Sequence, residues 1–160
     1  MAEELKKIIF LDRDGVINKK AEDHEYIARA EDFVINDGLF ELLRPWHDAG
    51  YEIIVITNQR GVARGKISDA NLAEIHSKML EIFSANNLNL LDIFYCPHEE
   101  DACDCRKPRP GLLRLAADKY RIDLEQAVLI SDSSADIEMG RNFGVGKNIL
   151  VRTDTLEVIE

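Results

Sequence analysis

The fold is decided by the stretch Ile8-Ile9-Phe10-Leu11-Asp12-Arg13-Asp14-Gly15, in which an apolar run ends abruptly in two acidic residues. An uninterrupted β-branched and aromatic run of this length predicts a strand that is buried on both faces. Asp12 and Asp14 lie two residues apart, so in an extended chain their side chains point to the same side. Gly15 permits the sharp turn that must follow. The stretch therefore predicts two carboxylates at the end of a buried strand.

The rest of the chain alternates apolar runs with helical patterns, which indicates an α/β fold. Four further strands are expected, at residues 51–57, 91–95, 127–130 and 148–151. Four helices are expected: 38–49, a long helix opened by Ser68, 111–120, and one from Ser133 or Ser134 to Gly144. Pro45 either kinks the first of these helices or marks its true start. This order predicts a doubly wound, mostly parallel, Rossmann-like sheet with helices on both faces.

Residues 1–160 are expected to form a single domain without a large cap. The segments between Asp14, Thr57 and Lys107 are consumed by the strands and helices above and by a polar loop, so no second fold fits between them. Residues 19–36 remain free to form a small flap. A site of this kind is nearly uncapped and must exclude water with loops alone.

Composition narrows the classes of partner. The chain has 160 residues, of which 46% are hydrophobic, so it can bury a core and is not disordered throughout. Its 20 basic and 30 acidic residues give a net charge of −10, which disfavours nucleic acid and anionic membranes as partners. No apolar run approaches the ~18 residues of a membrane span, and the first residues do not resemble a secretory signal. We therefore expect a cytoplasmic protein, monomeric by its small size, that acts on a small molecule.

Polar side chains follow four of the expected strands, at the edge where a doubly wound sheet binds its ligand. In chain order they are Asp12 and Asp14, then Thr57, then Lys107, then Asp132. Two aspartates this close repel unless a cation lies between them, and Mg²⁺ meets that need with Asp132 as a further ligand. A hydroxyl and a lysine suit the oxygens of a transferring phosphoryl group. The pattern therefore indicates magnesium-dependent phosphoryl chemistry.

Four short motifs, taken in order, resemble those of the haloacid dehalogenase superfamily of phosphatases: Asp12-x-Asp14, Thr57, Lys107 and Asp132-x-x-x-Asp136. The resemblance covers nearly the whole chain. It implies that Asp12 is the nucleophile and forms an aspartyl-phosphate. It also implies that Asp14 is the general acid for the leaving oxygen and then the general base for water.

The same resemblance implies roles for the remaining motif residues. Thr57 and Lys107 would hold the phosphoryl oxygens. Mg²⁺ would be bound by Asp12, Asp14 and Asp132, with Asp136 supporting either Lys107 or the metal shell. One residue departs from the family pattern, because Ser131 stands where the family usually has glycine.

A second cluster of ligating residues lies in the loop 96–105: Cys96, His98, Cys103 and Cys105. Three thiolates and one imidazole suit a tetrahedral Zn²⁺ site. Four protein ligands leave no position for water, so this zinc is expected to be structural. The loop is too polar to fold by core burial and leads directly into Arg106 and Lys107. We therefore predict that zinc fixes the loop that places those two cations.

The segment from Cys96 to Pro108 resembles a zinc-containing branch of the superfamily that holds heptose bisphosphate phosphatases and histidinol-phosphate phosphatases. Residues 57–65 resemble the heptose enzymes, whereas the four-residue spacing between His98 and Cys103 resembles the histidinol-phosphate branch. The preferred interpretation is removal of the 7-phosphate of D-glycero-D-manno-heptose 1,7-bisphosphate, a small phosphorylated sugar. Histidinol phosphate is the alternative substrate. A nucleic-acid 3′-phosphatase is a further alternative that the net charge disfavours, and a binding module with a dead site conflicts with the intact acidic pair.

Cations concentrate in the motif loops, which hold seven of the 20 basic residues: Arg13, Arg60, Arg64, Lys66, Arg106, Lys107 and Arg109. One phosphate needs only Lys107 and the metal, so several of the arginines are available to grip a second phosphate. The expected substrate contacts are therefore Asn58, Gln59, Arg60, Arg64, Arg106, Arg109 and Ser133. The remaining histidines, His24, His47 and His76, are expected on the surface or in helix packing.

Overall fold

The computed structural model describes residues 4–159, and its centre is a five-stranded parallel sheet. The strands are β1 (Ile8–Leu11), β2 (Glu52–Asn58), β3 (Leu90–Cys96), β4 (Val128–Ser131) and β5 (Lys147–Leu150). They lie in the order β3-β2-β1-β4-β5, and each neighbouring pair is parallel. The α/β prediction is therefore confirmed, with strand bounds within one residue of those expected.

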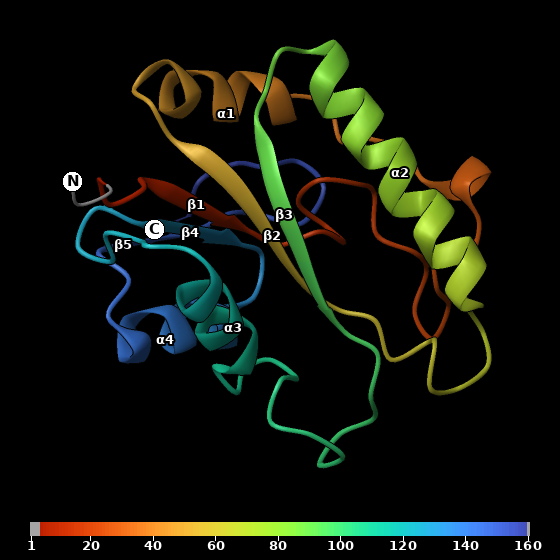
Figure 1. The fold of residues 1–160 in the computed structure, drawn as a ribbon. Coiled ribbons are helices and arrows are strands. Elements are labelled where there is room, and N and C mark those ends of the chain that lie inside the picture. The colour runs from red at the N-terminus through yellow and green to blue at the C-terminus, as the bar shows by residue number, and fades with distance from the viewer. Residues whose placement is uncertain (1–3, 160) are drawn as a thin grey trace.

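The helices are α1 (Leu39–Asp48), α2 (Asp69–Ala85), α3 (Gly111–Lys119) and α4 (Ser134–Phe143), with a short 3₁₀ helix η1 (Ala30–Asp32). In Figure 1, α1 and α2 lie on one face of the sheet and α3 and α4 on the other. The side chains of successive residues in β1 pack against opposite faces of the sheet. Ile9 and Leu11 pack in the core under α1 and α2, whereas Ile8 and Phe10 pack in the core under α3 and α4. The sheet is thus doubly wound.

Pro45 lies inside α1 and does not mark its start, so that alternative is wrong. The helix begins at Leu39, and Leu39 and Leu43 are buried on one of its faces. Proline has no N–H, so the helix loses one hydrogen bond at this position. Burial of that apolar face holds the first turns in place despite the loss.

The order in which the chain adds strands to the sheet reverses beside β1. From β1 the chain runs outward through β2 and β3, then returns to pair β4 with the other side of β1. Parallel sheets bind ligands beyond the carboxyl ends of the strands at such a reversal. The expected absence of a large cap is confirmed for residues 4–159, and no helix in this range has the length and apolar character needed to cross a bilayer.

Candidate active site

Asp12 follows β1 directly and contacts the lysine expected beside it. Lys107 Nζ donates to Asp12 Oδ1 at 2.9 Å and to Asp136 Oδ2 at 2.7 Å, and all three side chains are buried. Burial raises the pKa of Asp12 to about 7, an effect that Lys107 opposes and that Asp136 and Asp132 reinforce. Burial alone would lower the pKa of Lys107, but Asp12 and Asp136 outweigh it and keep the pKa above its usual range. Lys107 is therefore a permanent cation, and Asp136 is its partner.

Ser131, the residue that departs from the family pattern, lies between the two carboxylates that hold Lys107. Its Oγ is 2.9 Å from Asp136 Oδ2 and 3.3 Å from Asp12 Oδ2. The main-chain N–H of Ser133 donates to the same Oγ at 3.1 Å. A hydroxyl placed in this way lowers the charge repulsion between two buried acids, a contribution that glycine cannot make.

Asp14 is held by donors from three directions. Its Oδ1 accepts from Arg13 Nη2 at 2.8 Å and Asn18 Nδ2 at 2.9 Å, and its Oδ2 accepts from Gln59 Nε2 at 2.9 Å. Burial by itself would raise the pKa of Asp14, but Arg13 and these hydrogen bonds outweigh it and hold the pKa below its usual range. Asp14 is therefore ionised at neutral pH in the free protein.

Arg13 and Asn18 are fully buried, and sequence reasoning did not foresee their roles. Arg13 was grouped with cations that attract an anionic substrate, yet its guanidinium faces Asp14 and His76 Nε2, the latter at 3.3 Å. The one sequence signal for this role is the position of Arg13 between two aspartates at the end of a buried strand. Asn18 follows the turn by four residues and carries no such signal.

The two amides after Thr57 bind the protein itself. Asn58 Oδ1 accepts from Lys107 N at 2.9 Å and its Nδ2 donates to Lys107 O at 3.1 Å, so this side chain fixes the main chain of Lys107. Gln59 Nε2 lies 3.0 Å from Thr57 Oγ1 as well as contacting Asp14. Both also line the cavity that opens beside Asp14, so their predicted substrate contacts stay predictions alongside these internal hydrogen bonds.

The residues beside Asp12 fit a hard cation. Gly15 has a φ of 89°, and a Cβ at this position would collide with the Asp132 carboxylate. The lack of a side chain at residue 15 thus lets the Asp132 carboxylate pack closely against the turn that follows Asp12 and Asp14. The carboxylates of Asp12 and Asp132 supply oxygen atoms, which Mg²⁺ prefers. The Asp14 carboxylate, in contrast, is turned towards Arg13, Asn18 and Gln59.

The four residues predicted to bind zinc come together at the end of β3 and in the loop that follows: Cys96, His98, Cys103 and Cys105. Their ligand atoms all lie within 4.8 Å of one another, and Cys96 Sγ is 2.9 Å from Cys105 Sγ and 3.2 Å from Cys103 Sγ. This donor set fits a closed tetrahedral Zn²⁺ site. Arg109 is turned towards this loop, where its guanidinium donates to Cys103 O and Asp101 Oδ1. It therefore braces the loop, and its predicted substrate contact stays a prediction.

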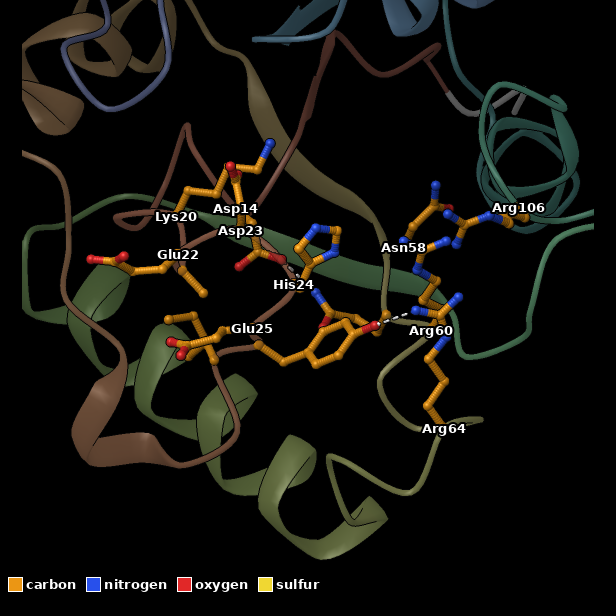
Figure 2. Close-up of a pocket in the computed structure, with 14 residues that line it drawn as sticks. Asp14, Lys20, Glu22, Asp23, His24, Glu25, Asn58, Arg60, Arg64 and Arg106 are labelled. Carbon is orange, nitrogen blue, oxygen red and sulfur yellow. Dashed lines mark hydrogen bonds between the residues drawn. The ribbon is translucent and has the colours of Figure 1, made fainter.

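A cavity of about 260 Å³ opens beside Asp14. One side is basic and is lined by Arg60, Arg64 and Arg106. The other side is formed by residues 20–27, part of the expected flap, and carries the acidic residues Glu22, Asp23 and Glu25 (Figure 2). Ser133 does not line this cavity, because its Oγ caps α4 by accepting from Asp136 N.

The three arginines differ in how they are engaged. Arg64 is paired with Glu99 and donates to Tyr26 Oη at 3.0 Å, a bond drawn dashed in Figure 2, so it ties the flap to the zinc loop. Arg60 lies 4.0 Å from Glu100, at the limit of an ion pair. Arg106 Nη1 is buried and has no hydrogen-bond acceptor among the described residues. Arg60 and Arg106 are therefore the cations best placed to receive an anion.

Comparison with known proteins gives consistent relatives. The polynucleotide kinase 3 phosphatase family matches residues 7–144. A D-glycero-alpha-D-manno-heptose-1,7-bisphosphate 7-phosphatase from Campylobacter jejuni is 38% identical over 151 residues, covering 94% of this chain and 86% of that protein. A D-glycero-beta-D-manno-heptose-1,7-bisphosphate 7-phosphatase from Vibrio cholerae is 38% identical over 156 residues, covering 92% and 82%. The crystal structure of D,D-heptose 1,7-bisphosphate phosphatase from B. bronchiseptica, complexed with magnesium and phosphate, matches with a TM-score of 0.83 and 33% identity, covering 93% and 82%.

Proposed function

Since this chain belongs to the polynucleotide kinase 3 phosphatase family of the haloacid dehalogenase superfamily, we propose that it is a magnesium-dependent heptose bisphosphate phosphatase. It releases the 7-phosphate of D-glycero-D-manno-heptose 1,7-bisphosphate. The observation that carries this proposal is the contact between Asp12 and Lys107 at the end of the central strand, with Asp14 nearby. The substrate is inferred from the names of the relatives, which match this chain over most of their length.

Hydrolysis proceeds in two displacements at phosphorus. A carboxylate oxygen of Asp12 attacks the phosphorus, the bond from phosphorus to the sugar oxygen breaks, and Asp14 gives that oxygen its proton. Water then attacks the aspartyl-phosphate, Asp14 accepts a proton from the water, and inorganic phosphate leaves with Asp12 restored. Thr57 and Lys107 hold the phosphoryl oxygens during both steps. The carboxylates of Asp12 and Asp132 would hold Mg²⁺, which would reduce the repulsion between the Asp12 carboxylate and the phosphate. The Asp14 carboxylate, predicted as a third ligand, is engaged by protein donors instead.

The low pKa of Asp14 suits the second displacement, which needs a carboxylate, but the first needs a proton on the same group. A phosphate group bound beside Asp14 raises its pKa, because a like charge disfavours the ionised form. We therefore infer that Asp14 gains its proton together with the substrate. Arg13 and Gln59 keep the carboxylate in place in both states.

The cavity suits a substrate with a phosphate at each end. Arg60 and Arg106 are assigned to binding the second phosphate. Arg64 is assigned to bracing the flap, because its guanidinium is already paired with Glu99. The acidic flap residues repel a continuous phosphate backbone, which favours a sugar bisphosphate over a nucleic-acid end. Ser133 and Arg109 are given no substrate contact, because their side chains cap α4 and brace the zinc loop.

We propose that Zn²⁺ bound by the loop 96–105 is structural and fixes the route of the chain into Lys107. Thiolate ligands stay available in a reducing compartment, which supports a cytoplasmic location. Small size supports a monomer, formed as the single domain that residues 1–160 predict.

The test compares phosphate release from both anomers of the heptose bisphosphate, histidinol phosphate and a 3′-phosphorylated oligonucleotide, each with added Mg²⁺. One heptose anomer should give the highest kcat/KM, and the anomer is read directly from the result. Asp12→Asn should lower turnover on the order of 10³-fold or more, while Asp118→Asn, the same change at an exposed position, should leave it intact. A higher kcat/KM for either alternative substrate would reject the proposed one, and an active Asp12→Asn variant would reject the nucleophile.

A further inference from the structure

Residues 151–159 follow β5 and lie beyond residue 144, where the family match ends. The segment is fixed by its own contacts. Arg152 N donates to Glu157 O at 2.8 Å, Leu156 N donates to Arg152 O at 3.0 Å, and the Leu156 side chain is buried. An antiparallel bridge joins Val151 to Val158. The segment is therefore a closed loop with a defined conformation.

Two residues at the tip of this loop reach the catalytic edge of the sheet. Thr153 Oγ1 donates to Asp132 Oδ2 at 2.8 Å. Asp154 N donates to Gly15 O at 2.8 Å, which joins the loop to the turn after Asp14. The loop thus contacts both segments from which the metal ligands project.

Asp154 extends this connection to the flap. Its Oδ1 accepts from Lys20 N at 3.0 Å and from Asn36 Nδ2 at 3.4 Å. Lys20 lines the cavity at the start of the flap, and Asn36 Nδ2 also donates to Val16 O. The main chain of Asp154 supports the first motif and its side chain supports the flap.

We propose that Thr153 is a positioning residue for the divalent cation, acting through Asp132. The proposal rests on the metal site of the proposed function. Asp132 is only partly buried, so without a partner its carboxylate samples several rotamers. The Thr153 hydroxyl selects one of them by donating to Oδ2, which leaves Oδ1 free for the cation. Hydrogen-bond partners that orient metal ligands typically change metal affinity 10–100-fold when removed.

The test measures metal binding without substrate. Thr153→Val keeps the shape of the side chain and removes the donor, and Thr153→Ser keeps the donor. Thr155→Val makes the same change two residues away at an exposed position. Mg²⁺ affinity is measured by calorimetry, Mn²⁺ affinity by electron paramagnetic resonance, and metal-free stability by thermal melting.

We expect Thr153→Val to lower the affinity for both metals about tenfold. Thr153→Ser and Thr155→Val should bind both metals with nearly the affinity of the unsubstituted protein. The melting temperature without metal should change little, and the Mg²⁺ concentration for half-maximal activity should rise with the dissociation constant. Unaltered metal affinity in Thr153→Val overturns the proposal, as does a loss that tracks reduced metal-free stability or that Thr153→Ser fails to rescue. If the unsubstituted protein binds neither metal, the metal site of the proposed function fails first, and that result is distinct.

Discussion

Replacing His76 by glutamine removes a buried imidazole from the far side of Arg13. His76 lies on α2, and its Nε2 is 3.3 Å from Arg13 Nη1. The pKa of His76 is lowered from 6.5 to about 4, chiefly by burial and also by the charge of Arg13, while Asp14 opposes the change. The ring is therefore neutral at physiological pH and accepts a hydrogen bond from Arg13. Glutamine offers Arg13 an acceptor oxygen but does not titrate.

The sign of the effect follows from proton uptake. As the pH falls below 6.5, the unfolded chain protonates this histidine, whereas the folded protein does so only near pH 4. The unfolded state therefore binds more protons, and the free energy of unfolding falls over this range. By pH 5.5 the titration of His76 lowers the free energy of unfolding by roughly 1.4 kcal/mol. That pH stays above the isoelectric point of 4.9, where the protein is least soluble.

The assay is urea unfolding at pH 7.5 and pH 5.5, followed by the fluorescence of Trp46, the single tryptophan. Between pH 7.5 and pH 5.5, the free energy of unfolding of the unsubstituted protein should fall by about 1.4 kcal/mol more than that of His76→Gln. Other titrating groups affect both proteins alike, so they cancel in the comparison. Equal losses in the two proteins would refute the assignment of a neutral, buried His76.

Three further predictions concern the site. Asn58→Ala removes both hydrogen bonds to the main chain of Lys107 and should lower kcat/KM about tenfold by misplacing the ammonium; steady-state kinetics that match the unsubstituted enzyme would contradict it. Gln59→Leu removes a donor from the Asp14 carboxylate and so raises its pKa, and the acid limb of the kcat profile should move to higher pH, whereas a fixed limb would argue against it. Cys105→Ser should reduce bound zinc below one per chain, measured by elemental analysis, and should lower kcat/KM; zinc-free protein with full activity would separate the loop from catalysis.

Much of the fold was predictable because burial on both faces of a parallel sheet leaves uninterrupted apolar runs such as Ile8–Leu11. The convergence of Asp12 and Lys107 was also predictable, because parallel strands end at one edge. What the sequence could not reveal was the direction of each side chain. Asn58 stands beside Thr57 yet faces the main chain of Lys107, and Arg13 carries a charge yet is buried.

Contacts between distant segments were harder still to foresee. Thr153 meets Asp132 and His76 meets Arg13 only after the sheet has formed, and neither lies in a motif. A lone threonine or histidine in a sequence is consistent with many environments. The zinc ligands were found because they lie within ten residues of one another, where spacing alone carries the information.

The reacting groups and the cavity walls come from different parts of the chain. Asp12 and its partners stand at strand ends, whereas the walls are residues 20–27 on one side and Arg60, Arg64 and Arg106 on the other. Sequence changes in the cavity walls can therefore alter substrate preference while the side chains proposed for hydrolysis stay in place. Transplanting both walls from a relative that prefers the opposite anomer should carry over that preference, with turnover of a generic aryl phosphate largely preserved.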